Sequence, residues 1–354
     1  MDCRKEGTLR QSFSYTNTNA RKGVWLVVKR RNSRSMALLF KLLLALTMLS
    51  LLSMLCFGCG KPKLAEPEGK PIYTLTDATG TKVSFTKKPE RIVSLSISTD
   101  EILLDLVEPK RIVALTKYVD DEGISNATEQ AKAVKGRVQA GNPEAILALR
   151  PDLILIPDFS SADTIQSLRE MQQPVYVYKT PSNLAGVRAC IRELGQVVGE
   201  EAAAQLILQR MEARLALLQQ KMGPIPAAKQ KWVIFMSDKG AYYSPEHSFN
   251  DICKHAQVVN ALSQLHFAKP ITVGQEEIVR LNPDAFILSG WVDSTDQEPD
   301  ALVHNLLQDP SYASVKAVKN KAIYALPAKH LLCLSQHIVE ASYDLARAVY
   351  GQEL

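Results

Sequence analysis

A pattern of nine residues occurs twice in this chain and limits what the chain can fold into. The first copy is Glu144-Ala-Ile-Leu-Ala-Leu-Arg-Pro-Asp152, and the second is Glu276-Glu-Ile-Val-Arg-Leu-Asn-Pro-Asp284. Both copies fit Glu-x-Ile-(Leu/Val)-x-Leu-x-Pro-Asp, and each is followed by an apolar run. The pattern is typical of a short helix, a turn and a buried strand. Because it appears once in each half, we expect two similar lobes.

The stretch Glu200–Met222 between the two copies contains neither Gly nor Pro, and its apolar residues recur at helical spacing. Gly199 precedes this stretch, and Gly223 and Pro224 end it. At about 1.5 Å per residue, such a helix is about 35 Å long, roughly the width of a small domain. We expect it to bridge the lobes and to bury one stripe of side chains: Leu206, Ile207, the stem of Arg210, Met211, Leu215 and Leu218.

Short apolar runs alternate with helical patterns on both sides of this helix. The expected strands are 91–96, 111–116, 153–156 and 175–178 in the first half, and 232–237, 285–288 and 322–326 in the second. Nearly uninterrupted apolar strands are typical of parallel sheets covered on both faces. Ser98 and Glu101 have the spacing of a capping box at the start of one helix. We therefore predict an α/β fold: two Rossmann-like lobes with parallel sheets, 71–199 and 223–354, joined by a single long interlobe helix, 200–222.

The N-terminal region has the organisation of an export signal. Residues 1–35 hold nine Lys/Arg and two Asp/Glu, and an uncharged apolar run from Leu42 to Gly58 ends directly before Cys59. A small residue followed by Cys resembles the bacterial lipobox. We expect 1–58 to be a signal peptide, Cys59 to be lipidated and 59–70 to be a flexible tether. An uncleaved membrane anchor is the alternative, and either Met1 or Met36 could be the start.

Charge and cysteine content limit the possible partners. The net charge of +5 comes from the N-terminal region, so the folded part is slightly acidic and we expect no nucleic-acid partner. The mature part keeps Cys190, Cys253 and Cys333, without C-x-x-C or zinc-type spacing. Cys253 and Cys333 could form a disulfide; three buried free thiols are the alternative that we favour.

The common sequence signatures of catalysis and phosphate binding do not occur. The sequence contains no G-x-x-x-x-G-K-(S/T), G-x-G-x-x-G or G-x-S-x-G. All six histidines follow the long helix, so the first half offers no imidazole to a metal held between the lobes. We therefore expect no catalytic residues, no resident metal and no cofactor, although an enzyme such as a metal chelatase remains an alternative.

Candidate ligand-binding residues stand just after predicted strands, where open α/β folds bind their ligands. These residues are Ser96, Tyr118 and Phe159 in the first half, and Tyr242, Tyr243, Trp291 and His330 in the second. Aromatic faces with a few polar groups suit a large planar or apolar ligand. The alternative is that these side chains only pack against their own loops.

Several segments resemble the substrate-binding proteins of bacterial ABC importers for cobalamin, ferric siderophores and haem. The segments are PIYTLTDATGTKVSFTKKPERIVSLSISTDEILLDL, RIVALTKYVDD, NPEAILALRPDLIL, EEIVRLNPDAFIL and AVKNKAIYALPAKHLLCLSQHIVEASYDLA. They are spread over about residues 70–354, and their order and spacing carry the likeness. The resemblance implies two lobes joined by one long helix, with the ligand bound in the cleft between them.

The resemblance also implies a function and roles for matching residues. The chain would be a monomer, exported and lipid-anchored to a membrane facing the periplasm or cell exterior, that delivers a metal chelate to an importer. Glu144 and Glu276 would pair with arginines of the permease dimer, and Tyr118 would contact the ligand. A role for each Glu in the first turn of its helix, where it favours the helix dipole, is an independent alternative. A surface adhesin on the same fold is a further alternative to transport.

Overall fold

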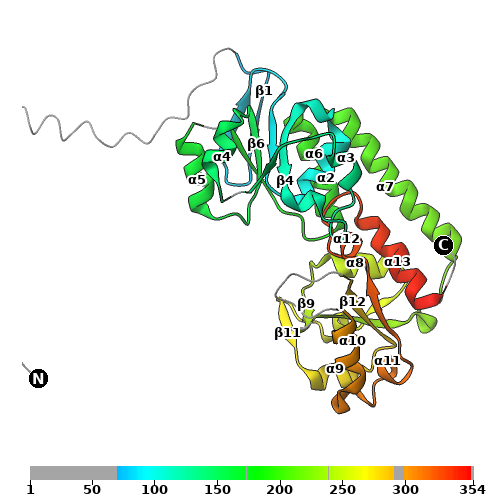
Figure 1. The fold of residues 1–354 in the computed structure, drawn as a ribbon. Coiled ribbons are helices and arrows are strands. Elements are labelled where there is room, and N and C mark those ends of the chain that lie inside the picture. The colour runs from blue at the N-terminus through cyan, green and yellow to red at the C-terminus, as the bar shows by residue number, and fades with distance from the viewer. Residues whose placement is uncertain (1–69, 140, 173, 238, 291–298, 352–354) are drawn as a thin grey trace, which may run out of the picture. The chain divides into compact units, whose positions relative to one another are not determined.

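The computed structural model describes residues 70–351 apart from 140, 173, 238 and 291–298. These residues belong to one compact unit, Pro62–Leu354, which contains two α/β lobes and the long helix α7 (Figure 1). The predicted signal peptide, Cys59, nearly all of the tether and Trp291 lie outside the described residues. No helix within the described residues is long and apolar enough to cross a membrane.

The first lobe is built on a five-stranded parallel sheet with the order β5-β4-β3-β6-β7. Its strands are β3 (Ile92–Ser94), β4 (Ile112–Thr116), β5 (Arg137–Val138), β6 (Leu153–Pro157) and β7 (Val175–Tyr178). An antiparallel hairpin, β1 (Tyr73–Thr76) and β2 (Lys82–Phe85), precedes the sheet. Every residue of β6 and β7 is buried, as their uninterrupted apolar runs predict.

Helices cover both faces of this sheet (Figure 1). They are α2 (Ile97–Leu106) and α6 (Leu184–Val198) on one face and α4 (Pro143–Ala148) and α5 (Ala162–Glu170) on the other, with a short α3 (Thr128–Ala131). Asn142 accepts a hydrogen bond from the N–H of Ala145 and caps α4, with Pro143 in the first turn. The cap of α2 is Ser96 rather than the predicted Ser98, because Ser96 is the residue with extended backbone and an oxygen near the N–H of Thr99.

The second lobe has a mixed sheet with the order β11-β9-β8-β12-β13, and β10 pairs with β8. Its strands are β8 (Trp232–Ser237), β9 (Gly240–Tyr243), β10 (Val259–Asn260), β11 (Ile271–Val273), β12 (Ala285–Ser289) and β13 (Ile323–Leu326). β8, β10, β12 and β13 pair in parallel as expected, but β9 and β11 are antiparallel. β9 begins three positions after β8 ends, and a parallel strand would need a crossover of about a dozen residues. The expectation of an entirely parallel sheet is therefore wrong at this edge.

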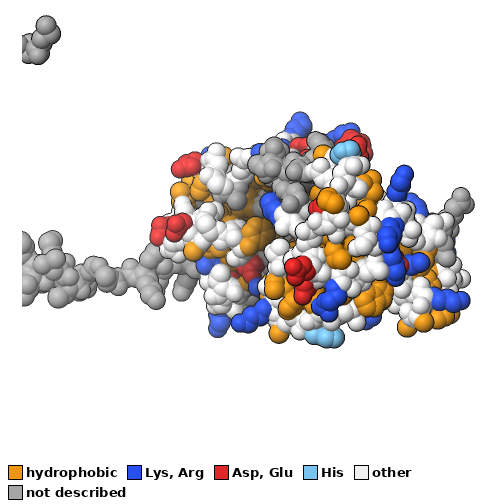
Figure 2. Space-filling view, turned by 90° about the horizontal axis from the view of Figure 1, so that it is seen from below, with side chains coloured by type: hydrophobic (Ala, Val, Ile, Leu, Met, Phe, Trp, Pro, Cys, Tyr) orange, Lys and Arg blue, Asp and Glu red, His pale blue; other side chains and the backbone are white. Residues whose placement is uncertain are grey.

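The helices of the second lobe also lie on both faces of its sheet. They are α8 (Ser248–His255), α9 (Gln275–Leu281), α10 (Pro299–Gln308), α11 (Lys316–Lys319), α12 (Ala328–Leu331) and α13 (Ile338–Tyr350). Short 3₁₀ helices complete the described part: Pro109–Arg111, Lys117–Asp120, Ala227–Lys229, Ala261–Leu265 and Pro310–Tyr312. The face shown in Figure 2 carries acidic and basic side chains interspersed with apolar ones.

The repeated Pro-Asp of the sequence pattern has the same structural role in both lobes. Asp152 accepts a hydrogen bond from the N–H of Arg91 at 2.7 Å, and its own N–H donates to the carbonyl of Arg91 at 3.0 Å. Asp284 does the same with Trp232, at 2.9 and 2.7 Å. Each aspartate therefore fixes the start of the neighbouring strand, β3 or β8, beside its own.

α7 (Glu201–Met222) agrees with the predicted helix, but its buried stripe differs at several positions: Arg210 is exposed, and Ala204 and Met222 are buried as well. Leu206, expected inside, is 54% exposed, and Leu208 is buried instead. The phase of the stripe is set where α7 crosses α6: a Cβ on Gly195 would lie 2.6 Å from the Cβ of Ala204. Position 208 is one turn from Ala204 and continues that buried row, whereas position 206 does not.

One continuous hydrophobic core passes through α7 into both lobes. It joins buried residues of α2 and α6 to those of α8 and α13, and further clusters lie beneath the outer helices of each lobe. Cys190, Cys253 and Cys333 are buried free thiols, in agreement with the favoured alternative. Burial raises the pKa of the Cys190 thiol to about 12. The lobes are thus parts of one packed body.

Candidate ligand-binding site

A cavity of about 260 Å³ is lined by residues of both lobes. The first lobe contributes Pro181 and Ser182 from the loop after β7. The second lobe contributes residues of β9, the loop before α8 and the start of α8, and the end of α12 with the segment after it. The polar side chains of the wall are Ser182, Tyr242, Ser244, Glu246, His247 and Ser248, and the apolar ones are Pro181, Leu331, Leu332 and Leu334. A wall that combines apolar surface with hydrogen-bonding groups suits a small molecule with both kinds of surface.

Tyr242 and His247 lie together on the second-lobe side of this cavity. Tyr242 is held on β9 by pairing with Thr272 of β11, and 46% of its surface is exposed. Its ring lies 6.0 Å from the ring of His247, at an angle of 68°. The antiparallel edge that sequence reasoning missed is therefore the element that positions a predicted ligand-binding aromatic.

His247 is oriented by a helix cap. Its Nδ1 accepts a hydrogen bond from the N–H of Phe249 at 3.1 Å, at the start of α8. Burial lowers the pKa of His247, which favours the neutral ring. A neutral imidazole that accepts at Nδ1 carries its proton on Nε2. His247 therefore offers a ligand an N–H donor, and not a lone pair for a metal ion.

His330 has the opposite arrangement. Its Nδ1 lies 2.5 Å from a carboxylate oxygen of Asp344, so in the neutral ring Nδ1 donates and Nε2 keeps its lone pair. A carboxylate behind one ring nitrogen is common among histidines that bind metals through the other. His330 stands on α12, whose Lys329 N–H donates to the carbonyl of Gly123 in the first lobe, but it is not part of the cavity wall.

Three predicted residues of the first lobe follow the adjacent strands β4, β3 and β6, and so share one edge of the sheet. Tyr118 is 52% exposed and Phe159 is 73% exposed, which leaves both rings open to a ligand. Ser96 is half-buried, and its Oγ lies 2.6 Å from the hydroxyl of Tyr178 and also caps α2. The hydrogen-bonding capacity of Ser96 is thus largely used within the fold.

Tyr243 differs from the other predicted aromatics because it is only 7% exposed and belongs to the core of the second lobe. Strand alternation explains this: Tyr242 and Tyr243 are neighbours on β9, so their side chains point to opposite faces. Trp291 lies outside the described residues. No group of three His, Cys, Asp or Glu within the described residues is arranged to hold a metal ion.

Sequence reasoning missed two buried carboxyl groups near the predicted site, Asp100 and Glu101 of α2. Asp100 is fully buried; one oxygen accepts from the N–H and hydroxyl of Thr116, and the other has no partner. Burial raises the pKa of Asp100 to about 7. The acidic residues just before the apolar run 102–104 were the signal for both, but the spacing of Glu101 from Ser98 suggested a capping role for Glu101.

Glu101 holds the two lobes together through its side chain. It accepts hydrogen bonds from the N–H of Asn126 at 2.7 Å, from the thiol of Cys333 at 3.4 Å and from the hydroxyl of Ser335. Asn126 in turn donates to the carbonyl of Lys329 at 2.6 Å. The junction behind the cavity is therefore a buried polar network that reaches both lobes.

Glu144 and Glu276 occupy equivalent exposed positions, in the first turns of α4 and α9. In the described part of the chain neither carboxylate has a hydrogen bond or an ion pair. In each lobe the helix is followed by the repeated Pro-Asp and then by a strand: β6 follows α4, and β12 follows α9. The two side chains therefore remain available to a partner.

The family model described as periplasmic binding protein matches residues 92–330. The chain belongs to the periplasmic binding protein family. A Bacillus subtilis protein named YvrC, an uncharacterized ABC transporter substrate-binding lipoprotein, is 26% identical over 326 residues, covering 87% of this chain and 95% of YvrC. A cobalamin-binding protein of Halobacterium salinarum is 22% identical over 285 residues, covering 78% of this chain and 74% of that protein.

A solved structure of a possible iron-binding, periplasmic solute-binding protein from Staphylococcus epidermidis has the same fold. Its TM-score is 0.64 at 22% identity, covering 75% of this chain and all of that one. The predicted fold class and family resemblance of this periplasmic binding protein are confirmed, and its relatives are substrate-binding proteins of transporters rather than enzymes. The roles of its individual site residues stay predictions.

Proposed function

We propose that this periplasmic binding protein captures a metal chelate, either a ferric siderophore, haem or cobalamin, and delivers it to the permease of an ABC importer. The observation that carries the proposal is the cavity lined by both lobes, with Tyr242 and His247 on its wall. The exposed rings of Tyr118 and Phe159 at the sheet edge of the first lobe support it. We propose that Trp291 and His330 also contact the chelate.

The size of the cavity favours a ligand that is only partly enclosed. Sites for drug-sized ligands usually measure about 300–1,000 Å³, and this cavity measures about 260 Å³. A macrocycle or siderophore would place one portion in the cavity and rest another on exposed aromatic rings. The Nε2–H of His247 suits an acceptor at the ligand's edge, such as a carboxylate or amide oxygen, better than it suits the metal.

Delivery would use the two lobes together. We propose that Glu144 and Glu276 each engage arginines of one permease subunit, because guanidinium groups bind carboxylates bidentately. We further propose that lipidation of Cys59 keeps the monomeric protein at a membrane facing the periplasm or cell exterior. The nearby tether, about residues 59–70, would let the folded part reach the permease.

The proposal is tested with absorption spectra, because all three chelates absorb visible light. Purified protein is titrated with haemin, cyanocobalamin and a ferric siderophore, and one of them should give a saturable spectral change. Tyr118→Ala and Tyr242→Ala should each weaken that binding by roughly 1–3 kcal/mol, the range for an aromatic at the centre of a contact.

The control is Ile72→Ala, which truncates an apolar residue that is 69% exposed and stands at the start of the first hairpin. It should bind the chelate as tightly as the unchanged protein. Equal affinity in both tyrosine variants would show that the ligand lies elsewhere. Failure of all three chelates to bind would refute the proposed ligand class.

A further inference from the structure

A cavity of about 600 Å³ lies at the edge of the second lobe where its parallel strands begin. Its wall comes from the loop before β8, the end of α9 with the turn to β12, and the start of α11. It shares no residue with the cavity of the proposed chelate site and includes neither Glu144 nor Glu276. The surface around it is therefore separate from the ligand site and the docking residues proposed above.

Five exposed lysines, which we call the lysine edge, surround the start of the strands here. Lys229, Lys231 and Lys316 line the cavity, and Lys319 and Lys321 follow at the end of α11 and shortly before β13. β8 and β13 pair in parallel on either side of β12. Lys231 and Lys321, which precede those two strands, therefore flank the start of β12.

The lysine edge has little acidic counter-charge. Asp284 is the one carboxylate of the cavity wall, and one of its oxygens accepts a hydrogen bond from the N–H of Trp232 at 2.9 Å. Its other oxygen lies 3.7 Å from Nζ of Lys316. Within the described residues, the side chains of the other four lysines have no ion pair. Four positive charges therefore stand together without acidic partners, although the folded part is slightly acidic as a whole.

Helix dipoles do not account for this charge. A basic side chain near a helix C-terminus is favourable because the aligned peptide dipoles leave a partial negative charge there. The helices that carry lysines of this edge, Ala227–Lys229 and α11, have only three and four residues. So few aligned peptide units make a small dipole, which does not require five lysines.

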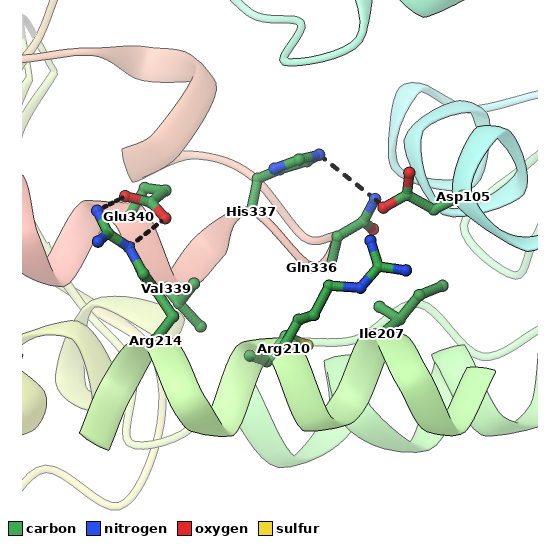
Figure 3. A pocket seen from close by; sticks show the side chains of 9 residues that line it. Asp105, Ile207, Arg210, Arg214, Gln336, His337, Val339 and Glu340 are labelled. Atoms are coloured by element: carbon green, nitrogen blue, oxygen red, sulfur yellow. Dashed lines mark hydrogen bonds and ion pairs between the residues drawn. The ribbon is translucent and has the colours of Figure 1, made fainter. Parts of the chain in front are cut away.

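A cavity where α2, α7 and α13 meet provides a contrast (Figure 3). Besides His337, its wall carries two basic residues, Arg210 and Arg214, and two acidic residues, Asp105 and Glu340. Arg214 binds both oxygens of Glu340, at 2.8 and 2.7 Å. Arginine and carboxylate groups in equal number give that wall no preference for an anion, whereas the lysine edge has a clear one.

An exposed apolar segment lies beside the lysines. Pro226, Ala227 and Ala228, directly before Lys229, are all exposed. Trp232 is half-buried and lines the cavity. Lysines attract anionic headgroups, and tryptophan and small apolar groups favour the boundary between headgroups and acyl chains. A free anion would use only the charge, so the combination favours a lipid surface.

We propose that the lysine edge binds the phosphate headgroups of an anionic lipid bilayer. The proposal rests on the proposed lipid anchor, which brings the folded part to a membrane: a fully extended tether of about twelve residues reaches about 40 Å. The tether enters at the first lobe, and the lysine edge belongs to the second. With both ends in contact, the folded part lies along the membrane.

The test uses the lipid-anchored protein added to preformed vesicles, of phosphatidylcholine alone or of equal parts of phosphatidylcholine and phosphatidylglycerol. An uncharged amine reagent labels the lysines, and mass spectrometry gives the rate at each position. Labelling of the five lysines of the edge should be at least about fivefold slower on the vesicles with phosphatidylglycerol. The exposed Lys135 of the first lobe should react equally on both. Flotation with the phosphatidylcholine vesicles checks the anchor separately, because these vesicles have no net charge.

Salt and phosphate identify what protects the lysines. About 1 M NaCl shortens the Debye length to about 3 Å and should abolish the protection. Inorganic phosphate added to the phosphatidylcholine vesicles should give none. Protection by phosphate alone would show a site for a small free anion and would overturn the proposal. Equal labelling of the lysine edge on both kinds of vesicle would overturn it as well.

Lys229→Gln/Lys231→Gln/Lys316→Gln locates the contact. These exposed positions tolerate substitution, so the melting temperature should stay nearly unchanged. On vesicles with phosphatidylglycerol, Lys319 and Lys321 of this variant should lose their protection, because three of the five charges that hold the edge on the membrane are gone.

The matched control is Lys110→Gln/Lys132→Gln/Lys135→Gln, which removes three charges from exposed positions of the first lobe. It should keep the protection of Lys319 and Lys321. Protection of these two lysines that persists without the three cavity lysines, or that is lost equally in both variants, would show that the lysine edge is not the membrane contact.

Discussion

At the scale of the residue, Asp100 is a carboxyl group removed from water without enough hydrogen bonds for its charged form. Burial raises its pKa from 3.8 to about 7. Between these two pH values the unfolded chain has already released this proton, whereas the folded protein still holds it. The contribution of Asp100 to the free energy of unfolding is therefore complete below about pH 4. This contribution decreases as the pH rises toward 7, and above about pH 7 it no longer changes with pH.

Asp100→Asn should remove this pH dependence, because an amide keeps the shape of the carboxyl group and does not ionise. Relative to the unchanged protein, the variant should gain a few kcal/mol in the free energy of unfolding between pH 4 and pH 8. Urea denaturation at both pH values measures the difference. The exposed Asp163→Asn serves as a control and should show no such change. Parallel stability profiles for unchanged protein and Asp100→Asn would contradict the account.

Individual side chains were the least predictable part of the candidate site. Strand order places Tyr118 and Phe159 at one sheet edge, and that much follows from the apolar runs that precede them. Whether an aromatic side chain faces outward depends on which face of the sheet its position in the strand points to. Tyr242 is exposed and Tyr243 is buried, although nothing in the sequence distinguishes the two. Glu101 was unpredictable in another way, because its partners Cys333 and Ser335 are more than 200 positions distant.

At the scale of the element, two leucines of α7 differ in burial, and this difference predicts how much each contributes to stability. Leu208 is 6% exposed within the shared core, and Leu206 is 54% exposed. Leu208→Ala should lower the free energy of unfolding by about 2–5 kcal/mol, the usual cost of a large-to-small change in a core. Leu206→Ala should change it by less than about 0.5 kcal/mol. Thermal or urea unfolding of both variants checks this, and equal losses would mean that the buried face of α7 is misassigned.

The elements themselves were largely predictable, because their signals are local. Asn142 and Pro143 mark the start of α4, and Gly199 with Gly223 bounds α7, all within a few residues of the helix concerned. The phase of α7 was not predictable, since the contact between Gly195 and Ala204 involves a second helix. The antiparallel β9 was missed because two of its four residues, Gly240 and Ala241, do not favour a strand.

At the scale of the whole molecule, the equivalent positions of Glu144 and Glu276 predict how transport depends on charge. Glu144→Arg and Glu276→Arg should leave chelate affinity and stability intact, because both side chains are exposed. Like charges at a permease interface cost several kcal/mol, so each variant should impair uptake and the double variant should impair it more. Uptake in a strain lacking the native protein measures this.

The control for this experiment is Glu129→Arg, which reverses an exposed charge on α3 outside the repeated pattern. It should transport normally. Normal uptake by the double variant Glu144→Arg/Glu276→Arg would contradict docking by the two glutamates. Each would then serve only in the first turn of its helix, where it favours the helix dipole.

The proposed membrane attachment depends on one residue. Cys59→Ala should release the protein from membranes or leave an unprocessed precursor, because no thiol remains to carry the lipid. Metabolic labelling with a radioactive fatty acid, followed by fractionation, distinguishes the forms. Label that persists in Cys59→Ala would place the lipid on another residue.

The buried carboxylate of Glu101 has a consequence for how cargo would leave. Pulling the lobes apart at this point would break the hydrogen bonds from Cys333 and Ser335 and leave those from Asn126, at a cost of about 0.5–3 kcal/mol for each bond lost. Thermal motion alone would rarely supply that work. We expect ligand release to be driven from outside the protein. A docking partner would bind both lobes and use the energy of nucleotide hydrolysis to separate them.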